Sequence, residues 1–232
     1  LGAADVTPLE LARAYATLAN GGVRPAVRFF EDLADASGRT LERSKATSEA
    51  VLDPGTSYLA VSLLQGVVDR GTAHAVRDAG ITGPVAGKTG TSDESKDAWF
   101  AGFTPELVAV VWVGFDQPRD MKLPAASLAV PIWLRFLRDA TGGAVPGAFE
   151  VPSSVHRIEI DPTSGAVALA GCPRREQEYF VEGTEPRATC PEGGWLVRGD
   201  EQLDEAARGA SGSRGKARSR GGWLDRLFDR WF

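Results

Sequence analysis

The sequence PVAGKTGTSDESKDAWFAGFTPELVAVVWVGFD, residues 84–116, decides the fold because a polar, glycine-rich cluster runs directly into two apolar segments. Both segments are apolar enough to be buried strands, and the TPE triplet at 104–106 supplies the turn between them. We therefore expect a group of antiparallel strands with the cluster at one end. We interpret the aromatic residues of these strands as core residues and not as a sugar-stacking platform. They are Trp99, Phe100, Phe103, Trp112 and Phe115.

The cluster AGKTGT, residues 86–91, shares the letters GKT with a phosphate-binding P-loop. That motif needs G-x-x-x-x-G-K-[ST] between a strand and a helix. Counting back from Gly87, the required glycine falls on Thr82, and the residues after Thr91 lead into a strand-like segment instead of a helix. A nucleotide site is therefore the weakest of our interpretations.

A carboxylate receptor explains the cluster better. On a strand, Lys88 and Thr89 project to opposite faces, and Thr91 shares the side of Thr89. Gly87 and Gly90 leave room for a ligand backbone to approach, and a cation beside hydroxyl donors suits a carboxylate. The alternative is a strand end with a solvated lysine. We interpret the acidic residues that follow, Asp93, Glu94 and Asp97, as a solvated loop.

Three segments carry the signals of helices. The first has Thr7 as its capping residue with a glutamate three positions later, a capping box. The second begins at Asp53 and ends at Gly71, and the third has Pro131 near its first turn. The segments are residues 5–22, 52–71 and 127–143.

The composition excludes two classes of protein. A net charge of −5 argues against a nucleic-acid binder, which would present a basic patch. The longest apolar run, residues 107–115, is far shorter than the ~20 residues that a membrane helix needs. Because the chain starts at Leu1 and its only methionine is Met121, we expect it to be a piece of a longer protein.

The sequence pattern changes from Phe149 on, where short β-like segments and a DPTSG turn enclose two cysteines. We favour a disulfide between Cys172 and Cys190, which would indicate an oxidising, extracytoplasmic compartment, over two free thiols. A metal site is not expected, because His74 and His156 lack ligand spacing.

The last residues combine a basic, low-complexity stretch with an amphipathic decapeptide, WLDRLFDRWF. We expect the stretch to be a flexible linker. We expect the decapeptide to form a helix against a membrane surface or a partner groove, with docking on its own domain as the alternative. Its apolar face would consist of Trp223, Leu224, Leu227, Phe228, Trp231 and Phe232.

Residues 1 to about 140 resemble the C-terminal half of the transpeptidase domain of class A, bifunctional penicillin-binding proteins. The similar stretches are VTPLELARAYATLANGG, SLLQGVVDRGTA, PVAGKTGTS, DAWFAGFTPELVAVVWVGFD and PIW, in the family's order and with comparable spacing. IDPTSGAVA, CP and GTEPRATC also resemble the short region that follows this domain in the family. It implies an α+β, β-lactamase-like partial domain, an antiparallel sheet packed by helices, with a small β-rich C-terminal appendage.

The resemblance also implies a reaction, serine acyl transfer on D-alanyl-D-alanine stem peptides of peptidoglycan, and binding of β-lactams without a cofactor. Lys88 would be the catalytic lysine of the K-T-G motif, beside the active serine. Thr89, Gly90 and Thr91 would bind the substrate carboxylate, and the Thr91 N–H would be one arm of the oxyanion hole. The family's compartment, the extracytoplasmic face of the cell membrane, would be this protein's as well.

Two of the family's three motifs are missing from the chain. Its only asparagine, Asn20, is not part of an S-x-N, and its only S-x-x-K, at 213–216, we interpret as a chance match in the linker. We therefore expect the nucleophile upstream of Leu1 and no activity from this chain alone. The rival interpretation is a non-catalytic, wall-binding or structural module with a vestigial K-T-G.

The expected organisation has four parts. Residues 1–145 would belong to the transpeptidase domain and residues 146–198 to the appendage with its cysteine pair. Residues 199–222 would be the linker and residues 223–232 the terminal helix.

Overall fold

The computed structural model describes residues 6–92 and 95–190. The expected linker, the terminal helix and the S-x-x-K at 213–216 lie outside these residues. The chain divides into two units, Leu1–Ser154 and Val155–Phe232, and each is described by itself.

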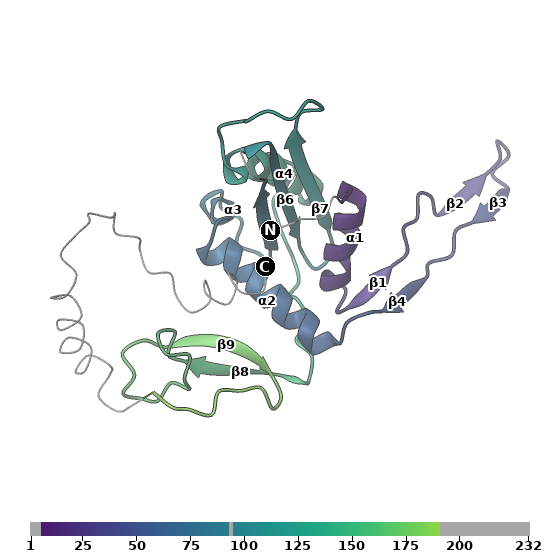
Figure 1. The fold of residues 1–232 in the computed structure, drawn as a ribbon. Coiled ribbons are helices and arrows are strands. Elements are labelled where there is room, and N and C mark those ends of the chain that lie inside the picture. Colours follow the sequence, from purple (N-terminus) through teal and green to yellow (C-terminus); the bar gives the residue numbers. More distant parts are fainter. Residues whose placement is uncertain (1–5, 93–94, 191–232) are drawn as a thin grey trace. The chain divides into compact units, whose positions relative to one another are not determined.

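The first unit is built on a three-stranded antiparallel sheet of β5 (Ala86–Thr91), β6 (Asp97–Phe103) and β7 (Val108–Gly114) (Figure 1). The strand order is β5-β6-β7, so β5 is an edge strand among the described residues. In the register, Lys88 lies opposite Ala101 and Thr89 opposite Phe100. The expected strand group is confirmed, and the glycine-rich cluster occupies its edge.

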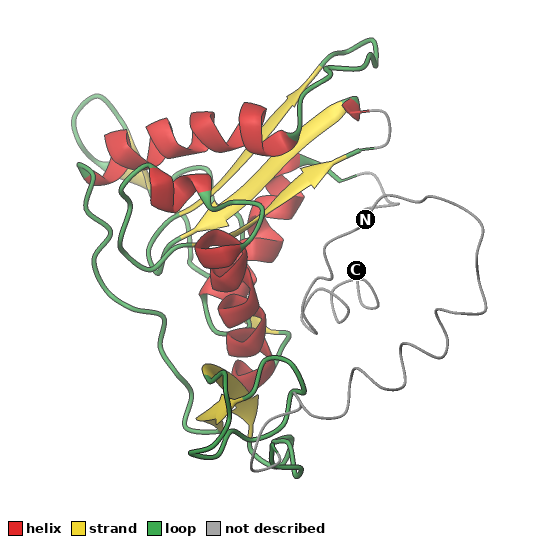
Figure 2. Ribbon diagram, turned by 90° about the vertical axis from the view of Figure 1, so that its left-hand side faces the viewer, coloured by secondary structure: helices red, strands yellow, loops and turns green. Residues whose placement is uncertain are grey.

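Helices α1 (Pro8–Ala19) and α4 (Ala125–Thr141) cover opposite faces of this sheet (Figure 2). Tyr15 of α1 packs edge-on against Phe103, with ring centroids 5.9 Å apart. Trp133 of α4 packs in the same way against Phe100, at 5.2 Å. Because Phe100 and Phe103 are an odd number of residues apart on one strand, they point to opposite faces. The α+β expectation is confirmed.

Helix α2 (Pro54–Arg70) packs against β5, and the short α3 (Ala75–Asp78) follows it. The expected caps are confirmed. Glu10 N–H donates to Thr7 Oγ1 at 3.2 Å while Thr7 N–H donates to the Glu10 carboxylate at 2.8 Å. Thr56 N–H donates to Asp53 at 2.8 Å, and Gly71 ends α2. These bonds satisfy amide groups that have no partner inside the first turn of each helix.

Two expectations about this unit are wrong. Pro131 lies inside α4, because the helix begins at Ala125 and not at Ser127. Pro131 is exposed, on the side of α4 away from the buried Trp133. The five aromatic residues are not all core residues: Phe100 and Phe103 are fully buried, but Trp112 and Phe115 are each 41% exposed. Strand β7 is only half-buried, so its outward residues reach the surface.

A long β-hairpin connects α1 to α2 (Figure 1). Its inner strands β1 (Val23–Pro25) and β4 (Ser48–Ala50) pair antiparallel, as do the outer strands β2 (Asp32–Ala34) and β3 (Thr40–Arg43). At the tip, Asp35 Oδ1 accepts from the N–H groups of Ser37 and Arg39, both at 3.0 Å. Such side-chain bonds to the backbone are typical of Asx turns.

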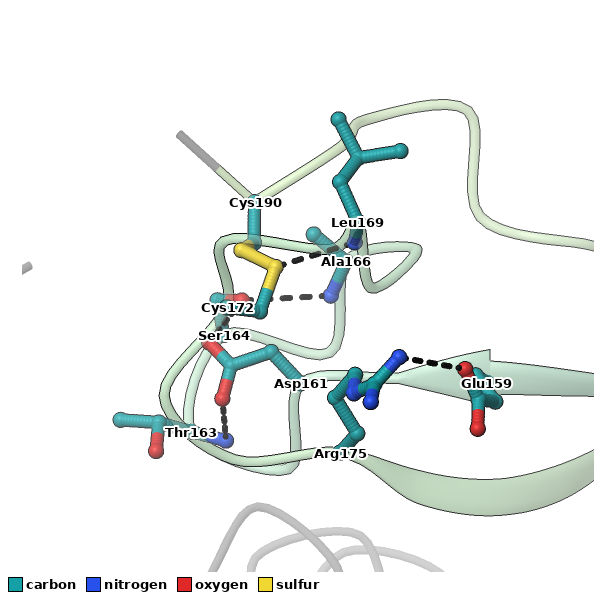
Figure 3. The surroundings of a disulfide bond; sticks show 9 residues. All are labelled: Glu159, Asp161, Thr163, Ser164, Ala166, Leu169, Cys172, Arg175 and Cys190. Atoms are coloured by element: carbon teal, nitrogen blue, oxygen red, sulfur yellow. Dashed lines mark hydrogen bonds and ion pairs between the residues drawn. A yellow bond between two sulfur atoms is a disulfide. The ribbon is translucent and has the colours of Figure 1, made fainter. Parts of the chain in front are cut away.

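The described part of the second unit is a small β structure in which β8 (Val155–Ile160) pairs antiparallel with β9 (Glu176–Val181). Val167 forms further bridges to Ile160 and Thr189. Cys172 and Cys190 form a disulfide, with Cα atoms 6.2 Å apart (Figure 3). The cross-link therefore ties the residue after Thr189 to the loop that precedes β9. In the part of the chain that the structure describes, no helix is long and apolar enough to cross a membrane.

Candidate functional site

The outer edge of β5 presents backbone groups that are not used by the sheet. Ser92 N–H donates to Asp97 O at 3.0 Å, so Ser92 and Asp97 are a hydrogen-bonded pair. In an antiparallel ladder such pairs alternate with non-bonded pairs. By this alternation Thr91 and Thr89, opposite Ala98 and Phe100, are in non-bonded pairs. Their N–H and C=O groups therefore point away from β6, toward the free edge.

Lys88 brings a cation to the same edge. Its side chain is half-buried, and Nζ donates to the outward-facing carbonyl of Thr89 at 2.8 Å. Burial lowers the pKa of Lys88, because a charged amine loses hydration in these surroundings. An amine with a lowered pKa gives up its proton more readily and is suited to a proton relay.

The hydroxyls of Thr89 and Thr91 lie on the opposite side of β5 from the Lys88 stem, as expected for alternate residues of a strand. Thr89 Oγ1 and Thr72 Oγ1 share a hydrogen bond of 2.8 Å. Thr91 Oγ1 accepts from the N–H of Ala125, the first residue of α4, at 3.3 Å. Since Thr91 is an acceptor in that bond, its own proton stays available to a ligand.

The contact of Thr91 with α4 replaces a missing helix cap. The capping position of α4 is occupied by Pro124, which has no side-chain oxygen and makes no side-chain cap bond. Thr91 supplies that acceptor from a distant strand. This hydrogen bond holds the end of β5 against the start of α4 and fixes the side chain of Thr91.

Asp97 fixes the other end of the same segment. Ser92 Oγ donates to Asp97 Oδ2 at 3.1 Å, and the indole N–H of Trp112 donates to Oδ1 at 2.9 Å. Asp97 N–H in turn donates to Ser92 Oγ at 2.8 Å. The interpretation of Asp97 as part of a solvated loop is therefore wrong. Asp93 and Glu94 lie outside the described residues.

The two glycines of the cluster have different roles. A Cβ on Gly87 would lie 2.8 Å from the carbonyl oxygen of Ala101 and from the ring of Phe100, so this glycine is needed for packing within the sheet. A Cβ on Gly90 would lie 3.4 Å from Trp99 Cβ, an ordinary contact. The expectation that Gly87 leaves room for a ligand is wrong, because Phe100 already fills that space.

The geometry does not fit a phosphate loop. Residues 87–89 lie within β5 and are followed by a turn and by β6, whereas a P-loop runs from a strand into a helix. Among residues 6–92 and 95–190, no group of three His, Cys, Asp or Glu side chains could hold a metal ion. His74 is exposed and lies 3.1 Å from the Asp78 carboxylate, and His156 is exposed on β8.

Sequence reasoning missed Thr72 and the bonds of Asp97. Thr72 stands in the stretch SLLQGVVDRGTA, but nothing local distinguishes its hydroxyl from that of any other surface threonine. Its partner is 17 residues away, on another element. The signal is tertiary and was not available from a single sequence.

Two family models match the chain. The model described as "Penicillin binding protein transpeptidase domain" matches residues 1–131. The model described as "Penicillin-binding protein 1A, C-terminal domain" matches residues 151–193. Together they cover the sheet unit up to α4 and the described part of the disulfide unit.

Curated relatives and solved structures agree with these matches. The chain is 35% identical to penicillin-binding protein 2D of Bacillus subtilis, over 82% of this chain and 28% of that protein. It is 36% identical to penicillin-binding protein 1A of Aquifex aeolicus, over 82% of this chain and 26% of that protein. The chain therefore spans little more than a quarter of the length of these relatives.

Among solved structures, penicillin-binding protein 1A from Haemophilus influenzae superposes with a TM-score of 0.75 at 27% identity, over 82% of this chain and 34% of that chain. A penicillin-binding protein from Mycobacterium tuberculosis superposes with a TM-score of 0.54 at 26% identity, over 63% of this chain and 41% of that chain.

Proposed function

Because the chain belongs to the penicillin-binding protein transpeptidase family, we propose that it forms one wall of the active site of a serine D,D-transpeptidase. The free edge of β5 carries this proposal. It combines an outward-facing N–H at Thr91, the amine of Lys88 and the hydroxyls of Thr89 and Thr91. An extended peptide can add to such an edge as a further strand.

The reaction needs an acyl-enzyme intermediate. A serine oxygen attacks the carbonyl carbon of the penultimate D-alanine, a tetrahedral oxyanion forms, and the terminal D-alanine leaves as its amine takes up a proton. An acceptor amine then attacks the ester and completes the cross-link. In a β-lactam the same attack opens the ring and leaves a stable ester.

The groups of the edge have separate roles in this scheme. Thr91 N–H donates to the oxyanion, Lys88 relays the proton of the serine, and the two threonine hydroxyls donate to the terminal carboxylate. The lowered pKa of Lys88 supports the relay role, because less free energy is needed to form the neutral amine than in a solvated lysine.

The remaining parts of the enzyme belong to the longer protein. We place the S-x-x-K serine and the S-x-N motif in sequence before Leu1, since neither occurs in a suitable position in this chain. The same longer protein would carry a glycosyltransferase domain and a membrane anchor and would act at the extracytoplasmic face of the membrane. Its substrates would be peptidoglycan stem peptides ending in D-alanyl-D-alanine, and its inhibitors β-lactams.

The proposal is tested by the rate at which the longer protein is acylated by benzylpenicillin. Lys88→Ala should slow acylation by about 10²- to 10⁴-fold, because general acid–base assistance is lost. Lys45→Ala, in the hairpin and exposed, is the matched control and should leave the rate unchanged. Circular dichroism of both variants checks folding. A wild-type rate in Lys88→Ala would favour the rival, a wall-binding module with a vestigial K-T-G.

A second experiment uses the isolated chain. Since it has no activated serine, a fluorescent penicillin should not label it covalently. Covalent labelling of the isolated chain would contradict the upstream position of the nucleophile.

A further inference from the structure

We infer that Thr72 is a positioning residue of the carboxylate site, which acts by orienting the hydroxyl of Thr89. The inference rests on the proposed function and adds to it a residue outside the K-T-G motif. The observation is the hydrogen bond of 2.8 Å between Thr72 Oγ1 and Thr89 Oγ1. It joins the segment after α2 to the edge strand β5.

Thr72 is held in place by a rigid turn. Gly71 N–H and Ala73 N–H both donate to Val67 O, at 3.1 and 3.2 Å, and Ala73 is fully buried. A Cβ on Gly71 would lie 2.9 Å from Val67 Cα, so only glycine lets the chain turn this closely against α2. The backbone on both sides of Thr72 is therefore fixed, while its side chain is exposed beside β5.

The hydroxyls of Thr72 and Thr89 together leave one O–H free to donate a hydrogen bond to a ligand. Each threonine hydroxyl has one O–H and two lone pairs, and the shared hydrogen bond uses one of the two protons. A carboxylate only accepts hydrogen bonds, so it needs the remaining proton. When Thr72 donates to Thr89, the Thr89 proton is free for the ligand. Lys88 Nζ, bonded to the carbonyl of Thr89, places a positive charge at the same residue.

Loss of the Thr72 hydroxyl therefore affects carboxylate recognition and not the acyl transfer itself. Thr72→Val keeps the shape of the side chain but removes the hydroxyl that forms the hydrogen bond with Thr89. The Thr89 hydroxyl is then free to rotate and to bond elsewhere. We expect acylation by a carboxylate-bearing ligand to fall about three- to tenfold, the size of one hydrogen bond.

The test compares acylation of the longer protein by benzylpenicillin and by benzylpenicillin methyl ester, which lacks the carboxylate. Thr72→Val should slow the acid about three- to tenfold and leave the ester rate within twofold, so the ratio of the two rates falls. Thr72→Ser, which keeps a hydroxyl, should give the wild-type ratio of the acid rate to the ester rate. Thr141→Val is the matched control, because its hydroxyl bonds Leu137 O at the end of α4.

A second comparison separates positioning from folding. If Thr72 acts through Thr89, adding Thr72→Val to Thr89→Val should change the ratio no further. Thermal unfolding identifies a misfolded variant, and Thr72→Ala then takes the place of Thr72→Val. An unchanged ratio, or an equal loss for acid and ester, overturns the role of Thr72. Failure of the wild type to acylate overturns the proposed function instead.

Discussion

The two units hold their backbones in different ways. In the first unit, Phe100, Trp133 and Leu137 are among the largest fully buried side chains, and a continuous apolar cluster joins α2, α3, α4 and the sheet. In the described part of the second unit, the buried apolar side chains are few, with Ile160 the largest fully buried one, and a disulfide closes the structure. Small units with little core commonly depend on such cross-links. The first unit should therefore respond to loss of apolar volume and the second to loss of its cross-link.

Removal of the Trp133 ring should give the largest effect. The indole packs edge-on against Phe100, and its N–H donates to Ala109 O at 3.1 Å. Trp133→Ala leaves a cavity between α4 and the sheet and should lower the free energy of unfolding of the first unit by about 3–5 kcal/mol. Hydrogen exchange resolved by peptide mass spectrometry should show faster exchange in β5, β6 and β7.

Phe136→Ala is the matched control for this change. Phe136 is an aromatic residue of the same helix but is 45% exposed, and its truncation should cost far less. Exchange in β8 and β9 should stay at the wild-type rate in both variants. A loss of protection in β8 and β9 with Trp133→Ala would contradict independent stabilisation of the units.

The disulfide should be the next largest contribution, and it concerns only the second unit. Replacing Cys172 and Cys190 by serine should lower the stability of that unit by about 3 kcal/mol, mainly because the unfolded chain is no longer constrained. Exchange should become faster in β8 and β9, and a reducing agent should have the same effect on the wild type. After expression in an oxidising compartment, non-reduced peptide mapping should find the two cysteine peptides linked; two thiols open to alkylation would contradict the pairing.

The features that were predicted correctly from the sequence depend on local signals. A capping residue, a proline at the first helical position or a turn triplet acts on its immediate neighbours, so Thr7, Asp53 and the turn before β7 were predictable. The family resemblance, drawn from several long stretches in order, is also confirmed.

The features that could not be predicted are contacts between distant elements. The bond of Thr72 to Thr89 and the bond of Trp112 to Asp97 depend on how strands and helices pack. The exposure of Trp112 likewise depends on what covers β7, and an apolar run does not say which of its faces is covered. Lys88, Thr89 and Thr91 were proposed as site residues from the motif, but the outward direction of the Thr89 and Thr91 backbone follows from the strand register alone.

The smallest of the expected effects concerns the turn that follows β8. Asp161 is only 3% exposed, and its carboxylate accepts from Thr163 N–H at 3.1 Å and from Ser164 Oγ at 2.7 Å (Figure 3). Burial alone would raise the pKa of Asp161, but the hydrogen bonds from Ser164 and Thr163 outweigh it and leave the pKa below its usual value. The ionised carboxylate is therefore the form that stabilises the turn.

Asp161→Ala should lower the stability of the second unit by about 1–3 kcal/mol, since it leaves donors without partners. Because the pKa is lower in the folded than in the unfolded unit, the wild-type advantage is present above the unfolded pKa, about 4. It is lost as the pH falls through the folded pKa. Exchange in β8 and β9, followed from pH 6 to pH 3, should therefore show the wild type approaching the variant as the pH falls. Asp35→Ala, which removes a similar turn acceptor from the hairpin tip of the first unit, should leave β8 and β9 unchanged. A difference between wild type and Asp161→Ala that stays constant down to pH 3 would show that the charge of Asp161 does not stabilise this turn.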